Sequence, residues 1–165
     1  MNLKNNLLEQ ENFNNIKQLL TSNNFAWFRQ KGVASLTDDE TADCYFTHLF
    51  YDNNEINSAS FNDLKPLLDK LKIKKLLRVK ANFYPRTEKV IEHDFHTDYP
   101  FEHKAIILSI NTNNGYTKFK DGTKANSIEN RSVEFDGSKK HKSTTCSDKF
   151  ARINLGINYI KEFKK

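Results

Sequence analysis

Cysteine is scarce in this chain, with two residues, Cys44 and Cys146, among 165. They lie far apart in the sequence and in no pair spacing that would bind a metal, so a disulfide framework is excluded as the basis of the fold. Two isolated thiols are typical of a reducing compartment, and we expect a cytoplasmic protein. The first fifteen residues interrupt their few leucines with Asn, Glu and Gln, unlike a signal peptide.

Long apolar runs and Gly/Pro-rich linkers are missing as well. No stretch approaches the roughly 18 consecutive apolar residues of a membrane helix, so we expect no membrane association. No repeat or linker divides the chain, which favours a single domain over residues 1–165 and, we expect, a monomer. Within it we expect a helical N-terminal part, about 1–72, and a strand-rich core, about 73–160.

The charge is moderately basic, with a net value of +5. Such a balance could favour nucleic acid or another polyanion. The lysines are dispersed, however, with short clusters only at 72–75, 139–142 and 161–165. An ordinary solvated surface is therefore the preferred interpretation.

Two helices are expected in the N-terminal part. The first has one apolar face and a stop at the two asparagines 23–24. The second spans about 62–71, with Asn62 or Asp63 as its cap and Pro66 in its first turn. The apolar faces comprise Phe13, Ile16, Leu19 and Leu20 in the first helix, and Leu64, Leu67, Leu68 and Leu71 in the second.

Strand patterns dominate elsewhere. Residues 76–84 alternate, with one face expected to hold Leu77, Val79, Ala81 and Phe83, and the other Arg78, Lys80, Asn82 and Tyr84. The strand at 104–112 is expected to turn at Asn114-Gly115 into a hairpin with 116–119, which Asp121-Gly122 ends. Further strands are expected at 45–51, 131–135, 141–146 and 151–160. Many short strands after helices predict a sandwich or barrel with helices on one side.

Histidine and aspartate together suggest a metal site. His96 and Asp98 stand two residues apart, so on a strand both side chains project from one face. His141 can supply a third ligand, although by itself it would be a surface histidine in a basic run. Two histidines and one carboxylate leave open positions on a metal, as in Fe(II) oxygenases. His93-Asp94 offers a competing register, which is less suitable because adjacent side chains on a strand point apart.

An arginine supports this interpretation. Arg152 follows His141 by eleven residues and opens a strand whose apolar face is Ile153, Leu155 and Ile157, so Arg152 lies on the opposite face. If that face lines a barrel interior, the arginine needs an anionic partner, and a guanidinium binds a carboxylate through two parallel hydrogen bonds.

The order His96-x-Asp98, His141, Arg152 resembles the 2-oxoglutarate/Fe(II)-dependent dioxygenase superfamily. Residues 113–119 are similar to the Gly-x-Thr-x-Phe hairpin of its prolyl-hydroxylase-like branch, and Asn82-Phe83-Tyr84 to an Asn-x-Tyr element. The resemblance covers roughly residues 76–160. The small size and the Asn/Lys-rich composition also resemble phage-encoded oxygenases, which would place the protein in the host cytoplasm.

The resemblance implies an α+β, mainly β fold: a double-stranded β-helix, or cupin-like jelly roll, with N-terminal helices packed on one side. It implies that His96, Asp98 and His141 are the catalytic Fe(II) ligands, that Arg152 binds 2-oxoglutarate, and that Tyr84 and Asn82 assist. The implied activity uses O2, with ascorbate in support, to hydroxylate a C–H bond and release succinate and CO2. The chain departs from the family in having Asn154 two positions after the arginine, and in having few residues for lids.

The substrate remains open. The prolyl-hydroxylase-like hairpin favours a peptidyl, prolyl substrate, and the basic charge makes oxidative demethylation of nucleic acid the next choice, with a small metabolite as a third. Two other classes compete: a non-catalytic metal-binding jelly roll, and a nucleic-acid-binding domain with Phe95, Tyr99 and Phe101 as stacking platforms. The sequence assigns no role to His48, His93 and His103.

Overall fold

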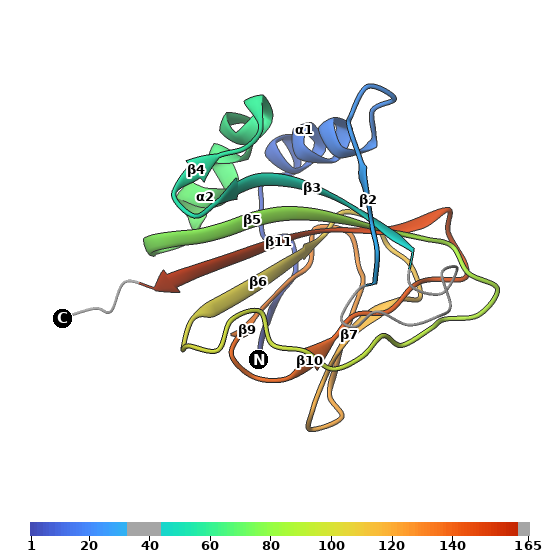
Figure 1. The fold of residues 1–165 in the computed structure, drawn as a ribbon. Helices are drawn as coiled ribbons and strands as arrows, with labels where there is room; N and C mark the ends of the chain where they lie inside the picture. Colours follow the sequence, from blue (N-terminus) through green and yellow to red (C-terminus); the bar gives the residue numbers. More distant parts are fainter. Residues whose placement is uncertain (33–43, 162–165) are drawn as a thin grey trace.

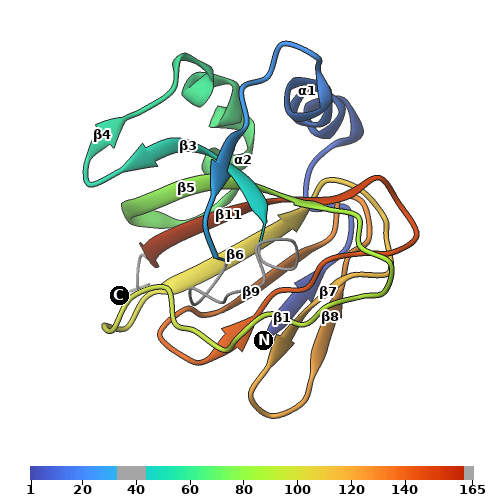
Figure 2. The same cartoon turned by 45° about the vertical axis from the view of Figure 1, so that its right-hand side comes forward.

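Two antiparallel sheets form the framework of the chain, which a computed structural model describes over residues 1–32 and 44–161 (Figures 1 and 2). The larger sheet has the order β1-β9-β6-β11-β5-β3-β2, with β4 paired to β3, and the smaller has the order β10-β7-β8. This arrangement confirms the mainly β, jelly-roll class. The larger sheet comprises β1 (Asn2–Lys4), β2 (Phe28–Gln30), β3 (Tyr45–Asp52), β4 (Glu55–Ile56), β5 (Ile73–Pro85), β6 (Lys104–Ser109), β9 (Ser132–Asp136) and β11 (Ala151–Lys161), and the smaller comprises β7 (Tyr116–Phe119), β8 (Lys124–Asn126) and β10 (His141–Lys142).

Helices cover one face of the larger sheet, as Figure 1 shows: α1 (Gln10–Thr21) and a 3-10 helix, η1 (Ala59–Leu64), that continues into α2 (Lys65–Lys70). Pro66 lies in the first turn of α2, as predicted. The predicted caps are wrong, because the segment turns helical earlier, in η1, where the Ser58 side chain accepts from the Ser60 N–H. No helix within the described residues is long and apolar enough to span a bilayer.

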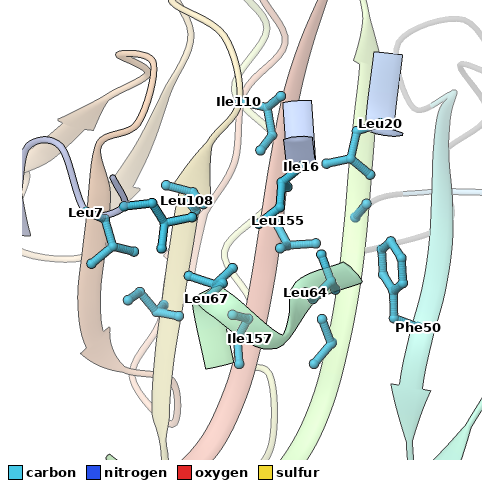
Figure 3. Close-up of a cluster of buried hydrophobic side chains, with 14 of the residues drawn as sticks. Leu7, Ile16, Leu20, Phe50, Leu64, Leu67, Leu108, Ile110, Leu155 and Ile157 are labelled. Carbon is cyan, nitrogen blue, oxygen red and sulfur yellow. The ribbon is translucent and has the colours of Figure 1, made fainter. Parts of the chain in front are cut away.

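The main hydrophobic core lies between these helices and the larger sheet (Figure 3). β11 contributes Ile153, Leu155 and Ile157, the apolar face that the sequence predicts. Because each fully buried Leu or Ile stabilises the fold by roughly 1.5–3 kcal/mol, this layer fixes which face of β11 turns away from the helices. The helices contribute Phe13, Ile16, Leu20, Leu64 and Leu67, all at most 1% exposed.

The predicted alternation of β5 breaks at Leu77. Leu76 is paired with Tyr159 and Arg78 with Asn158, so Leu77 has no partner in the ladder with β11 and forms a β-bulge. Leu76 therefore packs against the core, whereas Leu77 lies outside it. Beyond the bulge the predicted faces hold, with Val79 and Ala81 buried in the core.

The predicted hairpin at Asn114-Gly115 is wrong. β6 pairs with β9 and β11 in the larger sheet, whereas β7 pairs with β8 and β10 in the smaller one, so the chain crosses between layers here. Asn114 instead binds a neighbouring loop, since its side chain donates to Ser147 Oγ at 2.8 Å and accepts from the Ser147 N–H at 2.9 Å. The turn at Asp121-Gly122 is confirmed as the β7–β8 connection, with Gly122 at φ +87°.

The first 72 residues also supply strands that the sequence pattern does not reveal. β1 pairs with β9 at one edge of the larger sheet, and β2 pairs with β3 at the other. Both have only three residues, too few to show a hydrophobic period.

Candidate metal centre and anion pocket

Three potential metal ligands come together between the two sheets. One ligand atom from each of His96, Asp98 and His141 lies within 4.8 Å of the others. His141 is 4% exposed, and its Nε2 atom lies 3.8 Å from Asp98 Oδ2. The structure therefore unites the three residues that the sequence selects.

Backbone pairing positions this triad. His96 and His141 form an antiparallel bridge in which each N–H donates to the other's carbonyl, at 2.9 and 3.0 Å. The Asp98 N–H donates to the Gly137 carbonyl at 3.1 Å, which extends the pairing by one step. Because His96 and Asp98 lie in extended chain two residues apart, both side chains can face His141.

Both imidazoles present the same nitrogen to the centre. His141 Nδ1 lies 3.0 Å from the Lys139 carbonyl, and His96 Nδ1 lies 3.4 Å from the Asp94 carbonyl. A carbonyl accepts but does not donate, so it favours the tautomer with the proton on Nδ1, and Nε2 keeps its lone pair for a metal. Burial lowers the pKa of His96, as does the positive charge of a protonated His141, which favours the neutral form that binds metals.

Asp98 is held at both oxygens. Arg78 Nη2 donates to Oδ1 at 3.1 Å, and Asn158 Nδ2 donates to Oδ2 at 2.8 Å. Burial alone would raise the pKa of this carboxyl, but His141, Arg78 and Asn158 outweigh it and keep the pKa below its usual value. Arg78 and Asn158 were not predicted as supporting residues from the sequence. Arg78 shares a strand face with Tyr84, and Asn158 shares one with Arg152, so the strand period could have identified both.

A polar cavity adjoins the triad on the side of the larger sheet that faces away from the helices. Its walls include the inward side chains of β5 and β11, residues 105–107 of β6, Thr117 of β7, and Ser143, which directly follows β10. Five of the candidate residues line it: His96, Asp98, Asn82, Tyr84 and Arg152. The face of β11 that carries Arg152 therefore lines the interior, as the interpretation of this arginine requires, and the polar face of β5 lines it as well.

Arg152 is 1% exposed and lines this cavity. Its guanidinium donates to Ser127 Oγ at 2.8 Å, to Thr117 Oγ1 at 3.0 Å and to the Thr144 carbonyl at 3.2 Å. All three acceptors are neutral, and within residues 1–32 and 44–161 no carboxylate forms an ion pair with Arg152. A buried cation without a counter-charge is costly, so the site suits an anionic ligand.

Tyr84 and Asn82 lie beside this arginine on β5. The Tyr84 ring is 5.4 Å from the guanidinium carbon of Arg152, and burial raises the pKa of its hydroxyl, which stays protonated. Asn82 donates to Asn154 Oδ1 at 2.9 Å. Asn82 and Asn154 both line the cavity. Asn154 stands at the position where a small or hydroxyl residue was expected, and its side chain is held there by Asn82.

The other histidines lie outside the triad. His93 Nδ1 lies 2.9 Å from Ser143 Oγ, so the competing His93-Asp94 register does not form the cluster. His48 packs among Phe25, Phe28 and Phe50 near η1. The third, His103, packs against Gly137, where an added Cβ would lie 2.2 Å from the ring.

The suggested stacking platforms are engaged within the protein. Lys120 Nζ and Lys142 Nζ lie 5.0 and 4.5 Å from the centre of the Phe95 ring. Tyr99 and Phe101 stack on each other at 5.3 Å. These contacts do not favour a separate nucleic-acid-binding domain.

A scan against protein-family models and a search of curated proteins find no match for the chain. Among solved structures, it is similar to a prolyl hydroxylase from Trichoplax adhaerens in complex with a hypoxia-inducible-factor peptide, with a TM-score of 0.68, 11% identity and coverage of 97% of this chain and 83% of that one. It is also similar to a Pseudomonas putida prolyl-4-hydroxylase, with a TM-score of 0.64 and 10% identity, and the match covers 97% of this chain and 92% of that one. A third similar structure is an α-ketoglutarate-dependent non-haem epimerase from nogalamycin biosynthesis, with a TM-score of 0.66 and 10% identity. The match covers 96% of this chain and 76% of that one.

These similarities define the class of fold. The chain has the double-stranded β-helix fold of 2-oxoglutarate/Fe(II) oxygenases, and it carries a His-x-Asp…His triad. At about 10% identity the comparison extends to the fold alone, and the three structures include two prolyl hydroxylases and one epimerase. Function must therefore be argued from the site.

Proposed function

We propose that the protein is a non-haem Fe(II)- and 2-oxoglutarate-dependent dioxygenase that hydroxylates a C–H bond. The observation that carries the proposal is the convergence of the triad and of a buried arginine without a carboxylate partner on one cavity. A metal-binding scaffold needs the triad but not the arginine. A co-substrate with a free carboxylate needs both.

The donor set fits Fe(II). Two imidazole nitrogens and one carboxylate suit this ion, and three protein ligands leave positions for the co-substrate and O2. His96, Asp98 and His141 would hold the iron. When bound, the iron supplies the oxidative chemistry in which 2-oxoglutarate and O2 yield succinate, CO2 and a hydroxylated product, with ascorbate in support.

The residues of the chain bind and orient the reactants. Arg152 binds the distal carboxylate of 2-oxoglutarate in a two-pronged contact, and its three neutral partners fix the guanidinium in advance. Tyr84, whose hydroxyl stays protonated, donates to the same carboxylate, and Asn82 supports it from the next inward position. Arg78 and Asn158 keep the Asp98 carboxylate oriented.

For the primary substrate we propose a peptidyl target, with proline favoured. Support comes from the two similar prolyl hydroxylases, one of them in complex with a peptide. Nucleic acid is the alternative. The lysines of the β7–β8 hairpin and Lys142 favour nucleic acid. However, Glu92 forms ion pairs with Lys118 and Lys142 at 2.9 and 2.6 Å, and its negative charge partly offsets theirs.

Binding of the metal and the co-substrate tests the proposal without a known substrate. The protein is titrated with Mn(II), a redox-inert substitute for Fe(II), and then with 2-oxoglutarate by calorimetry. We expect 2-oxoglutarate to bind the loaded protein and to bind at least about tenfold more weakly to His141→Ala under the same conditions. If Mn(II) binds and 2-oxoglutarate does not, the protein is a metal-binding jelly roll without oxygenase activity.

A further inference from the structure

Lys80 lines the same cavity as Arg78, Arg152 and two residues of the triad, His96 and Asp98. It is partly buried, and within residues 1–32 and 44–161 its ammonium group makes no hydrogen bond and no ion pair. Its Nζ lies 6.0 Å from the centre of the Tyr45 ring. The proposed binding of iron and 2-oxoglutarate gives this lysine no role.

The strand register places Lys80 near the triad. Along the ladder of β5 with β11, Tyr84 is opposite Arg152, Lys80 is opposite Gly156, and Arg78 is opposite Asn158. At about 3.3 Å per residue, Lys80 lies roughly 7 Å along the strand from Arg78, which holds Asp98, and roughly 13 Å from Tyr84. Lys80 is therefore at the metal end of the cavity, away from the arginine.

Gly156 lies opposite this lysine in the ladder of β11 with β5. A methyl group added at Gly156 would lie 3.6 Å from the Lys80 carbonyl and 3.8 Å from Asn82 Nδ2, which are ordinary van der Waals distances. The row of inward side chains on β11 is therefore interrupted opposite Lys80, with room for a small group.

The charge of the cavity calls for another anion. Arg78, Lys80 and Arg152 line it together with one carboxylate, Asp98, which leaves two positive charges among the described lining residues. A divalent metal adds two positive charges and 2-oxoglutarate removes two, so the excess persists after both bind. Arg78 is paired with Asp98 and Arg152 is assigned to 2-oxoglutarate, which leaves Lys80.

The titration behaviour agrees with this assignment. Burial, together with the charge of Arg78, lowers the pKa of Lys80 to about 8 and outweighs the opposite effects of Asp98 and Asp52. A lysine held where its charge is disfavoured regains its ordinary pKa when an anion binds beside it.

We infer that Lys80 binds a carboxylate of the primary substrate and holds that substrate beside the triad. The inference rests on the proposed function, because it assigns Arg152 to the co-substrate. The carboxylate can come from an acidic side chain next to the target in a peptide, or from a small free acid. In either case Lys80 selects acidic substrates over their neutral amides.

The test uses the Mn(II)-loaded full-length chain saturated with 2-oxoglutarate, with acetate as the minimal carboxylate probe and acetamide as its neutral match. Calorimetry compares wild type with Lys80→Met, Lys80→Arg and the control Lys74→Met, which removes an exposed charge from the same strand. We expect acetate to bind wild type, Lys80→Arg and Lys74→Met about tenfold or more tightly than acetamide, and Lys80→Met to lose that preference. Equal binding of acetate and acetamide to wild type, or an unchanged preference in Lys80→Met, overturns the inference.

Two further arms separate the sources of the carboxylate and the possible targets of Lys80. Doubly blocked peptides with a central Asp or Asn represent the peptide source, and L-proline with L-prolinamide represents the free acid, so a Lys80-dependent preference in either pair supports the inference and identifies the source.

The affinity for 2-oxoglutarate itself is then compared between variants. If Lys80→Met weakens the binding of 2-oxoglutarate as much as Arg152→Met does, Lys80 binds the co-substrate and the inference is wrong. If wild type fails to bind 2-oxoglutarate at all, the proposed function fails instead.

Discussion

Arg78 donates from Nη2 to Oδ1 of Asp98 at 3.1 Å, from a strand twenty residues before it in the chain. Asn158 donates to the other oxygen at 2.8 Å. The carboxylate of the triad is thus oriented by side chains from two strands of the larger sheet. Contacts of this kind determine how well a site fits its metal.

Replacing Arg78 with Met should weaken metal binding. The substitution frees one oxygen of Asp98 and removes the cation that helps to keep it ionised, so we expect the affinity for Mn(II) to fall about 10- to 100-fold. Metal titration by calorimetry measures the change, with Lys74→Met as the control for lost charge. Equal affinities in Arg78→Met and wild type would show that Arg78 has no part in the centre.

Gly115 makes room for Arg152. A Cβ at Gly115 would lie 2.6 Å from Arg152 Cδ and 2.5 Å from the Thr145 carbonyl, so Gly115→Ala must displace the arginine side chain, the backbone at Thr145, or both. We expect it to lower the free energy of unfolding by about 1–3 kcal/mol and to weaken 2-oxoglutarate binding at least about tenfold. Chemical denaturation and calorimetry measure the two effects.

Gly122→Ala is the matched control for that variant. Gly122 has φ +87° with no atom within 4 Å of an added Cβ, so alanine there strains the backbone and touches nothing. A loss of about 1 kcal/mol in stability with normal 2-oxoglutarate binding is expected. If both glycine variants affect 2-oxoglutarate equally, the effect is one of general stability and the role given to Gly115 is wrong.

His93 should make the fold sensitive to acid. Burial lowers its pKa to about 4, with a contribution from Arg152, whereas an unfolded histidine titrates near 6.5. Because the folded pKa is the lower one, the neutral histidine's contribution is fully present above pH 6.5 and is lost as the pH falls towards 4. The loss amounts to up to about 3 kcal/mol at the acid end of that window.

Urea unfolding of wild type and His93→Gln between pH 7 and 4 measures this effect. Glutamine can keep a hydrogen bond to Ser143 without titrating, so the difference in unfolding free energy between the two proteins should shrink or reverse as the pH falls. A difference that stays constant over the window would mean that His93 titrates normally in the folded protein.

The residues of the metal centre could be predicted from sequence because their signals are local or follow the strand period. His96 and Asp98 share a face at a spacing of two, and Arg152 lies opposite a clear apolar face. The predicted apolar faces of α1 and β11 are confirmed for the same reason, because the periodic spacing of apolar residues within each element shows which side is buried.

The features that the sequence did not reveal depend on contacts between distant segments. Asn114-Gly115 has the composition of a hairpin turn, but pairing in another sheet and the approach of Arg152 to Gly115 decide its structure. The bulge at Leu77 is a mismatch between two strands, which neither strand shows alone. Lys80 has the same pattern as a solvent-facing lysine until the cavity is known.

Formation of succinate from 2-oxoglutarate, without added substrate, tests the central claim most directly. Purified protein is incubated with Fe(II), ascorbate, O2 and 2-oxoglutarate, beside His141→Ala and Arg152→Met. The proposed function predicts slow Fe(II)-dependent succinate formation in wild type, none in His141→Ala, and recovery in Arg152→Met only at much higher 2-oxoglutarate concentration. Succinate formation at equal rates in all three proteins would contradict it. So would its absence in wild type together with a failure of the Fe(II)-loaded protein to bind 2-oxoglutarate.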